Sequence, residues 1–307
     1  MLTPCDYTTT MDAWPVLHWS DWAETAQTLQ LWTQVAGKIR MAKTPAVNHW
    51  WHVPLYVTTR GLGTSPIPHE QRTFSIDFDF VDQRLRVRCS DGAEQSFPLA
   101  PMSVATFHRR IMDAVAAIGI DVTINTRPSE VENPIRFEED EQHKTYDADA
   151  ARRFWCALVQ ADRVMNAFRA SFIGKSSPVH FFWGSFDLAV TRFSGRRAPK
   201  HPGSPMLPDA VTHEAYSHEV SSAGFWPGGN GADAMFYAYT YPAPDGFAKA
   251  RVKPDAAFYS EAMGEFFLPY DAVRQSSTPD EMLLDFLQST YEAAADLAKW
   301  DRKALER

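Results

Sequence analysis

The 307-residue chain has few cysteines and no long apolar run. Its three cysteines, Cys5, Cys89 and Cys156, cannot all pair with one another and do not show the CxxC spacing of a zinc site. No stretch approaches the roughly 18 consecutive apolar residues of a membrane-spanning helix. The first residues, MLTPCDYTTTMDAW, also lack the basic and apolar segments of a secretory signal. These absences predict a cytoplasmic protein without a membrane partner.

Basic residues and nucleotide-binding motifs are scarce as well. The net charge of −8 and the lack of a lysine and arginine stripe argue against nucleic acid as a partner. The phosphate-loop pattern GxxxxGK[ST] fails because Arg169 stands where its first glycine is required, and no GxGxxG begins a helix. The zinc-protease helix pattern is absent, since His213 and His218 are five residues apart. We therefore expect no dinucleotide site and no phosphate-loop nucleotide site.

Aromatic residues, by contrast, are abundant. They make up 13% of the chain, with ten Trp and twenty Phe, which indicates an aromatic core or a cleft that holds a flat or apolar molecule. Apolar residues at 45% and charged residues at 22% are ordinary for a globular protein. A chain of 307 residues can bury a large core, and we predict a single domain over residues 1–307.

Two stretches of the sequence resemble each other. Residues 37–61, GKIRMAKTPAVNHWWHVPLYVTTRG, and residues 174–197, GKSSPVHFFWGSFDLAVTRFSGRR, each begin with Gly-Lys, contain a His followed by two aromatic residues and then reach Thr-Arg. We expect each Gly-Lys pair to lie at a helix end and each of His49 and His180 to lie in a strand. The repeat predicts two similar halves about a pseudo-two-fold axis, with a cleft between them.

Hydrophobic periodicity indicates the same organisation. In each half, apolar residues with helical spacing precede short segments in which apolar and polar residues alternate, and a second helical pattern follows. Strands and helices do not alternate one by one, which argues against a parallel doubly wound sheet. We predict an α+β fold, an antiparallel sheet with flanking helices. Its halves are residues 19–126 and 147–300, joined by an acidic linker at residues 127–146.

The segment FSIDFDFVDQRLRVRC predicts a hairpin with one charged face. With a two-residue turn at residues 82–83, Asp79 lies opposite Arg86 and Asp77 lies opposite Arg88. We interpret this face as solvated and functionally silent rather than as a general acid–base pair. Removing one of its carboxylates should then destabilise the protein by no more than about 1 kcal/mol.

The strand that begins at His180 carries the candidate catalytic residues. Both of its faces are apolar, so we expect a central strand that is covered on both sides. An ionised Asp187 in it needs a cation, a metal or several hydrogen-bond donors. His180 or His218 would be the acid or base, and Asp187 would fix its tautomer or join both histidines as ligands of a divalent metal. A purely structural ion pair at Asp187 is the alternative.

Further residues are predicted to bind substrate. Arginines at the strand ends would hold an anion through forked hydrogen bonds, and aromatic side chains would line the cleft. The candidates are Arg60, Arg192, Arg196, His49, Trp183 and Tyr216. Together they predict a cytosolic enzyme for a small, anionic and partly apolar substrate. The alternatives are a non-catalytic binding or sensor protein that uses the same cleft, and an interaction module. The pattern specifies neither a reaction nor an oligomeric state.

Three segments carry a resemblance to known proteins. NHWWHVPLYVTTRG, GKSSPVHFFWGSFDLAVTRFSGR and YSHEVSSAGFWPGG resemble segments of a bacterial family of unknown function, and the resemblance covers nearly the whole chain. It implies a bacterial protein. Because the family has no established activity, the resemblance implies no catalytic role for any residue.

Overall fold

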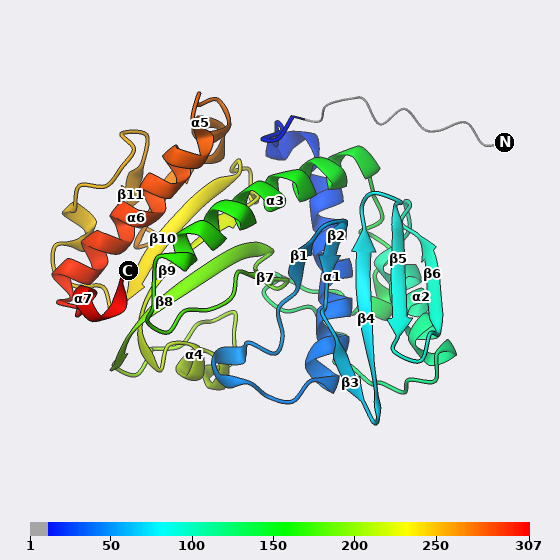
Figure 1. The fold of residues 1–307 in the computed structure, drawn as a ribbon. Helices are drawn as coiled ribbons and strands as arrows, with labels where there is room; N and C mark the ends of the chain where they lie inside the picture. The colour runs from blue at the N-terminus through cyan, green and yellow to red at the C-terminus, as the bar shows by residue number, and fades with distance from the viewer. Residues whose placement is uncertain (1–11) are drawn as a thin grey trace.

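Two antiparallel sheets form the centre of the computed structural model, which describes residues 12–307 (Figure 1). The first half of the chain supplies one sheet and two helices, and the second half supplies the other sheet with its own helices. The predicted α+β fold with antiparallel sheets and flanking helices is confirmed. No helix in residues 12–307 is both long and apolar enough to cross a lipid bilayer. Cys5 and the segment compared with a secretory signal lie outside these residues.

The first sheet buries one face against helices α1 (Ala23–Lys43) and α2 (Val104–Ala117). Phe78 stacks on Phe107 of α2, which in turn stacks on Trp32 of α1 at 4.7 Å. The strand order is β1-β2-β4-β5-β6, with β3 beside β4. The strands are β1 (Tyr56–Thr58), β2 (Gly61–Gly63), β3 (Ile67–His69), β4 (Arg72–Asp79), β5 (Arg84–Cys89) and β6 (Glu94–Pro98).

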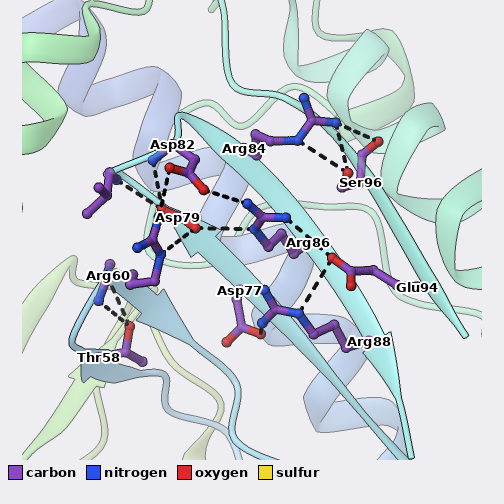
Figure 2. A network of polar contacts seen from close by, with 12 residues as sticks. Thr58, Arg60, Asp77, Asp79, Asp82, Arg84, Arg86, Arg88, Glu94 and Ser96 are labelled. Carbon is purple, nitrogen blue, oxygen red and sulfur yellow. Dashed lines mark hydrogen bonds and ion pairs between the residues drawn. The ribbon is translucent and has the colours of Figure 1, made fainter. Parts of the chain in front are cut away.

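The register of β4 and β5 differs from the prediction. Asp79 lies opposite Arg84, and Asp77 lies opposite Arg86, because the turn contains four residues, 80–83, instead of two. Asp79 itself forms this turn: its Oδ1 accepts hydrogen bonds from the N–H groups of Val81 and Asp82 at 3.0 and 2.9 Å. The expectation of a solvated Asp79 was therefore wrong, because its side chain is only 3% exposed (Figure 2).

The second sheet has the order β11-β12-β10-β9-β8-β7. Helices α3 (Ala148–Ala170) and α6 (Pro279–Leu297) pack together on one face, while α4 (Asp209–Ala215) lies on the opposite side (Figure 1). Two short helices, α5 (Tyr270–Arg274) and α7 (Arg302–Leu305), flank α6 in the chain. The strands are β7 (His180–Phe182), β8 (Asp187–Arg197), β9 (His218–Trp226), β10 (Met235–Tyr241), β11 (Phe258–Ser260) and β12 (Glu265–Pro269).

The two halves meet at a backbone bridge and share one hydrophobic core. Leu55 and Phe181 exchange two N–H···O hydrogen bonds of 2.9 Å. Beside this bridge, Trp183 donates from Nε1 to the carbonyl of Val53 at 2.9 Å. The ring of Trp183 lies so close to α1 that a Cβ on Gly37 would overlap it. The close approach of Trp183 from the second half therefore explains why α1 has a glycine at position 37.

Each half has the predicted order of helix, antiparallel strands and helix, but the residue matches proposed between segments 37–61 and 174–197 are wrong. Gly37 lies inside α1, whereas Gly174 follows α3. His49 lies in a 3-10 turn, η2 (Asn48–Trp50), and its φ of 59° is left-handed, whereas His180 begins β7. The two segments have similar sequences but different structures, and they contact each other through Leu55 and Phe181. The pseudo-two-fold axis stays a prediction.

Candidate functional site

The face of the second sheet that points away from α3 and α6 carries most of the predicted site residues. Side chains alternate along a strand, so Arg192 of β8 faces α3 while Asp187 and Phe193 face the opposite side. The register places His180 beside Ala189, Gly224 and Tyr237 in one row across this face. We call the face defined by His180, Asp187, Phe193, Tyr237, Tyr239 and Glu265 the polar face.

Two segments distant in sequence cover the polar face. His49 of η2 stacks against Phe193 with ring centroids 4.8 Å apart. Tyr216, just after α4, shares a hydrogen bond of 2.9 Å between its hydroxyl and that of Tyr239. The structure thus brings His49 and Tyr216 to the same face as His180, Asp187 and His218. From the sequence, His49 and Tyr216 were predicted only as residues that line a cleft.

Asp187 lies at one end of this face and is 7% exposed. Its carboxylate accepts hydrogen bonds from the hydroxyls of Ser185 and Tyr237. Tyr237 belongs to β10, two strands from β8, and its ring reaches across Gly224 of β9, where a Cβ would overlap it. Burial raises the pKa of Asp187, and the two hydrogen bonds offset only part of this effect.

Two further carboxyl groups lie near Asp187, from other parts of the chain. Glu130 belongs to the segment between the halves, has a left-handed φ of 56°, and lies against Gly184. Glu265 is the first residue of β12. Burial, followed by the charge of Asp187, raises the pKa of both Glu130 and Glu265 to about 7. We call Asp187, Glu130, Glu265 and Tyr237 the carboxyl cluster.

Sequence analysis missed most of this cluster. Glu130 was assigned to the acidic linker, and Tyr237 was not among the candidate residues. Only tertiary contacts bring Glu130 to Asp187, so no spacing in the sequence reports it. Glu265, however, is an acidic residue at the start of an otherwise apolar strand, the same signal that identified Asp187.

A second group of side chains lies at the other end of β8. Lys175 Nζ is 2.7 Å from Nε2 of His49. His49 Nδ1 is 3.1 Å from the carbonyl oxygen of Glu214, so Nδ1 is the donor and Nε2 accepts from the ammonium group. The ammonium lies 5.2 Å from the ring centre of Trp51 and 5.0 Å from that of Phe193. Burial and the charge of Lys175 lower the pKa of His49.

His218 and Arg197 complete this group. They pair across β8 and β9, and the rings of His218 and His49 meet edge to face at 5.8 Å. Burial lowers the pKa of His218, and the charges of Arg197 and Lys175 lower it further. We call Lys175, His49, His218 and Arg197 the basic cluster. Its position near Phe193, six residues from Asp187 along β8, puts it roughly 20 Å from Asp187 at about 3.3 Å per residue.

This separation argues against the predicted metal triad. His218 belongs to the basic cluster, and Asp187 belongs to the carboxyl cluster at the opposite end of the face. Within residues 12–307, no group of three His, Cys, Asp or Glu side chains is arranged to hold a metal ion. A shared metal centre at His180, His218 and Asp187 is therefore not formed.

His180 is isolated from both clusters. It is 1% exposed and surrounded by the rings of Trp51, Tyr56 and Phe182 at 5.6 to 5.9 Å. Neither ring nitrogen has a hydrogen-bond partner among the described residues. Burial, with the charges of Arg40 and Arg169, lowers the pKa of His180 to about 3. The predicted His180–Asp187 hydrogen bond is not formed, and His180 stays neutral near pH 7.

Arg192, a predicted anion ligand, is 1% exposed on the opposite face of the second sheet. Its guanidinium lies 3.4 Å from the ring centre of Phe168 and 4.3 Å from that of Tyr291. It donates to the Phe168 carbonyl and, at 3.0 Å, to the hydroxyl of Ser171, at the end of α3. Burial lowers the pKa of Arg192 to about 10. The side chain stabilises a helix end and does not reach the polar face.

The other two predicted anion ligands also have partners within the protein. Arg60 lies on the first sheet, where it pairs with Asp79 at 2.7 Å and Asp82 at 2.8 Å (Figure 2). Arg196 pairs with Glu219 at 2.7 Å and donates to carbonyls at the end of α6. The three arginines are therefore separated, and they do not form one anion clamp. Trp183 likewise packs between the halves, as described above.

Comparison with known proteins identifies a family for this chain, but that family has no known activity. The model of a family of unknown function (DUF5996) matches residues 14–307. No curated protein and no solved structure matches the chain. The side chains of the polar face are therefore the basis for assigning a function.

Proposed function

The chain belongs to the family of unknown function DUF5996, and we propose that it is an enzyme that acts on a small molecule by general acid–base catalysis. The observation that carries this proposal is the carboxyl cluster. Asp187 accepts a hydrogen bond from the hydroxyl of Tyr237, and its charge acts on two buried glutamates from two other segments of the chain. Buried carboxyl groups that raise one another's pKa values are costly for a folded protein, and they are a recurrent feature of active sites.

The properties of the individual groups suit proton transfer. Glu130 and Glu265, each with a pKa of about 7, are close to half protonated at neutral pH. A group in this state can both donate and accept a proton at the working pH of a typical enzyme. Asp187 is fixed in place by Ser185 and Tyr237 and acts on the protonation of the two glutamates through its charge. In this proposal the glutamates, rather than His180 and His218, transfer the proton.

The surroundings support a small, partly apolar substrate. Tyr239 and Tyr216 place aromatic rings and a pair of hydroxyls beside the carboxyl cluster. Tyr237 and Tyr239 stack nearly parallel with ring centroids 6.2 Å apart, which gives a flat aromatic wall next to the acids. Such a combination of aromatic surface and few polar groups is typical of small-molecule sites.

The test is an unbiased assay for substrate turnover. The purified protein is incubated with a mixture of small molecules extracted from cells, and mass spectrometry follows which compounds disappear. Conversion should fall by at least about 100-fold in Glu265→Gln or Glu130→Gln, the usual effect of losing a general acid or base. Glu139→Gln, an exposed carboxylate outside the cluster, serves as the matched control and should not change conversion.

Two outcomes would overturn the proposal. One is full conversion by both glutamine variants. The other is a carbon-13 NMR titration in which Glu130 and Glu265 ionise near their ordinary pKa of 4.5, because the cluster would then hold no proton at neutral pH. Saturable binding without any conversion would identify the non-catalytic binding protein predicted as the alternative.

A further inference from the structure

The basic cluster contains positive charges that are not neutralised by the protein. Within residues 12–307, neither Lys175 nor Arg197 takes part in an ion pair. The nearest acidic residue in sequence to His218 is Glu219, which is occupied by Arg196 and by the hydroxyl of Ser194. Groups that repel one another in this way are stabilised when an anion binds between them.

The geometry of Lys175 leaves hydrogen-bond donors free. An ammonium group has three N–H donors, and one of them points to His49 Nε2. The aromatic rings of Trp51 and Phe193 contact its charge but accept no conventional hydrogen bond. Lys175 is exposed, so its remaining donors are accessible to a ligand from solvent.

The position of His49 is fixed by an unusual backbone. His49 and Trp50 both have left-handed φ values, 59° and 61°, which non-glycine residues rarely adopt. The carbonyls of Glu214 and Ala215, at the end of α4, hold Nδ1 of His49 at 3.1 and 3.3 Å. This strained turn places Nε2 beside Lys175 and orients the ammonium. This backbone conformation fixes the position of the His49 ring relative to Lys175.

From these observations we propose that the basic cluster binds the oxyanion group, phosphate or carboxylate, of a small molecule whose apolar part lies against Trp51. Lys175 and Arg197 supply the charge, and His218 supplies a further nitrogen beside them. Trp51 is only partly buried, and its ring already lies 5.3 Å from that of His49, so it provides an apolar surface at the site. This site is separate from the carboxyl cluster and does not rest on the proposed enzymatic activity.

The site can be tested without knowing the natural ligand. Imidazole C–H signals of His49 and His218 are followed by NMR while inorganic phosphate, phenyl phosphate or benzoate is added at constant pH and ionic strength. We expect saturable shifts of both histidines in the wild-type protein. Lys175→Met should weaken the affinity at least tenfold, Lys175→Arg should retain most of it, and Lys249→Met, an exposed lysine elsewhere, should leave it unchanged.

The aromatic probes distinguish the two oxyanions. Tighter binding of phenyl phosphate than of inorganic phosphate would support a phosphate ligand with an apolar part, and tighter binding of benzoate would support a carboxylate. If Lys175→Met does not fold, Arg197→Met, at the exposed end of β8, should weaken binding at least threefold.

The proposal would be overturned if none of the three anions produced a saturable shift in the wild type. It would also be overturned if Lys175→Met and Arg197→Met both kept the wild-type affinity. Glu265→Gln should bind these anions normally. Loss of turnover in that variant with intact anion binding therefore separates the two proposals, and either one can fail alone.

Discussion

On the charged face of the first sheet, carboxylates lie next to guanidinium groups, whereas on the polar face of the second sheet they lie next to other carboxyl groups. Asp79 is bound by Arg60 and Arg86 at 2.7 and 3.2 Å (Figure 2). Asp187 is bound by neutral hydroxyls and has Glu130 and Glu265 as charged neighbours. Neutralised charge stabilises the first sheet, whereas charge without a counter-ion on the second sheet is the feature on which the proposed function rests.

The largest effect is expected at the neutralised carboxylate. Asp79→Ala removes two guanidinium contacts and the acceptor for two backbone N–H groups in the β4–β5 turn. The free energy of unfolding should fall by about 3 kcal/mol, measured by urea denaturation. Glu94→Ala, which removes a half-exposed partner of Arg86, should change it by no more than about 1 kcal/mol. Equal, small effects of both variants would contradict the structural role given to Asp79.

The pH dependence of stability should have opposite signs on the two sheets. Folding raises the pKa of Glu130 and Glu265 from 4.5 to about 7, so the folded protein binds more protons than the unfolded chain between these values. Their contribution to stability is present below about pH 4.5 and is lost as the pH rises through 7, by at most about 1.4 kcal/mol per pH unit for each group.

Asp79 should behave in the opposite way. Burial raises its pKa, but hydrogen bonds from Arg60 and the backbone of Asp82 more than offset this and hold the pKa below its ordinary value. Its contribution is therefore present near neutral pH and lost in acid. Denaturation of the wild type and of the Glu130→Gln, Glu265→Gln double variant is measured between pH 4.5 and 7. The difference between them isolates the contribution of the two glutamates to the free energy of unfolding. The two curves should lie closest near pH 4.5, where the side chains at both positions are neutral in the folded protein, and the wild type should become the less stable of the two as the pH rises to 7. Parallel curves would refute the raised pKa values.

Removing the charge of Asp187 should affect its neighbours more than the stability of the fold. Asp187→Asn keeps an acceptor for Ser185 and Tyr237 but removes the charge that raises the pKa of Glu130 and Glu265. Both glutamate pKa values should fall in a carbon-13 NMR titration, and the free energy of unfolding should change by no more than about 1 kcal/mol. A loss of 3–5 kcal/mol would instead reveal a broken buried ion pair.

The smallest effect is expected at the isolated histidine. His180→Phe removes two nitrogens without partners, so the free energy of unfolding at pH 7 should change by about 0.5 kcal/mol or less. Below pH 6.5 the unfolded chain protonates this histidine while the folded protein, with a pKa of about 3, does not. The wild type should therefore lose stability relative to the variant at pH 5.

Local patterns in the sequence were sufficient to predict the fold class. Alternation along β4 and β5 and the helical spacing of apolar residues report burial directly, and these elements formed as expected. The register of the hairpin could not be predicted, because it depends on a side chain, Asp79, that bonds its own turn.

A candidate site residue could be predicted from the sequence only where a charged residue interrupts an otherwise apolar strand. That conflict identified Asp187. Glu130 and Lys175 gave no such signal, because each lies in an irregular segment and reaches the polar face through contacts between distant residues. The similarity of the two His-aromatic-aromatic segments misled the prediction, since Gly37 is required for the approach of Trp183 and not for the end of a helix.

Both clusters are composite. The carboxyl cluster takes Glu130 from the segment that precedes α3 and its other acids from β8 and β12, and the basic cluster pairs His49 of η2 with Lys175, which follows α3. A fragment that ends before residue 147 and its complement would thus each carry an incomplete set of groups. If the two proposals hold, neither fragment should show the full activity alone and both functions should return on reassembly, so that they would report on how the two parts of the chain are joined.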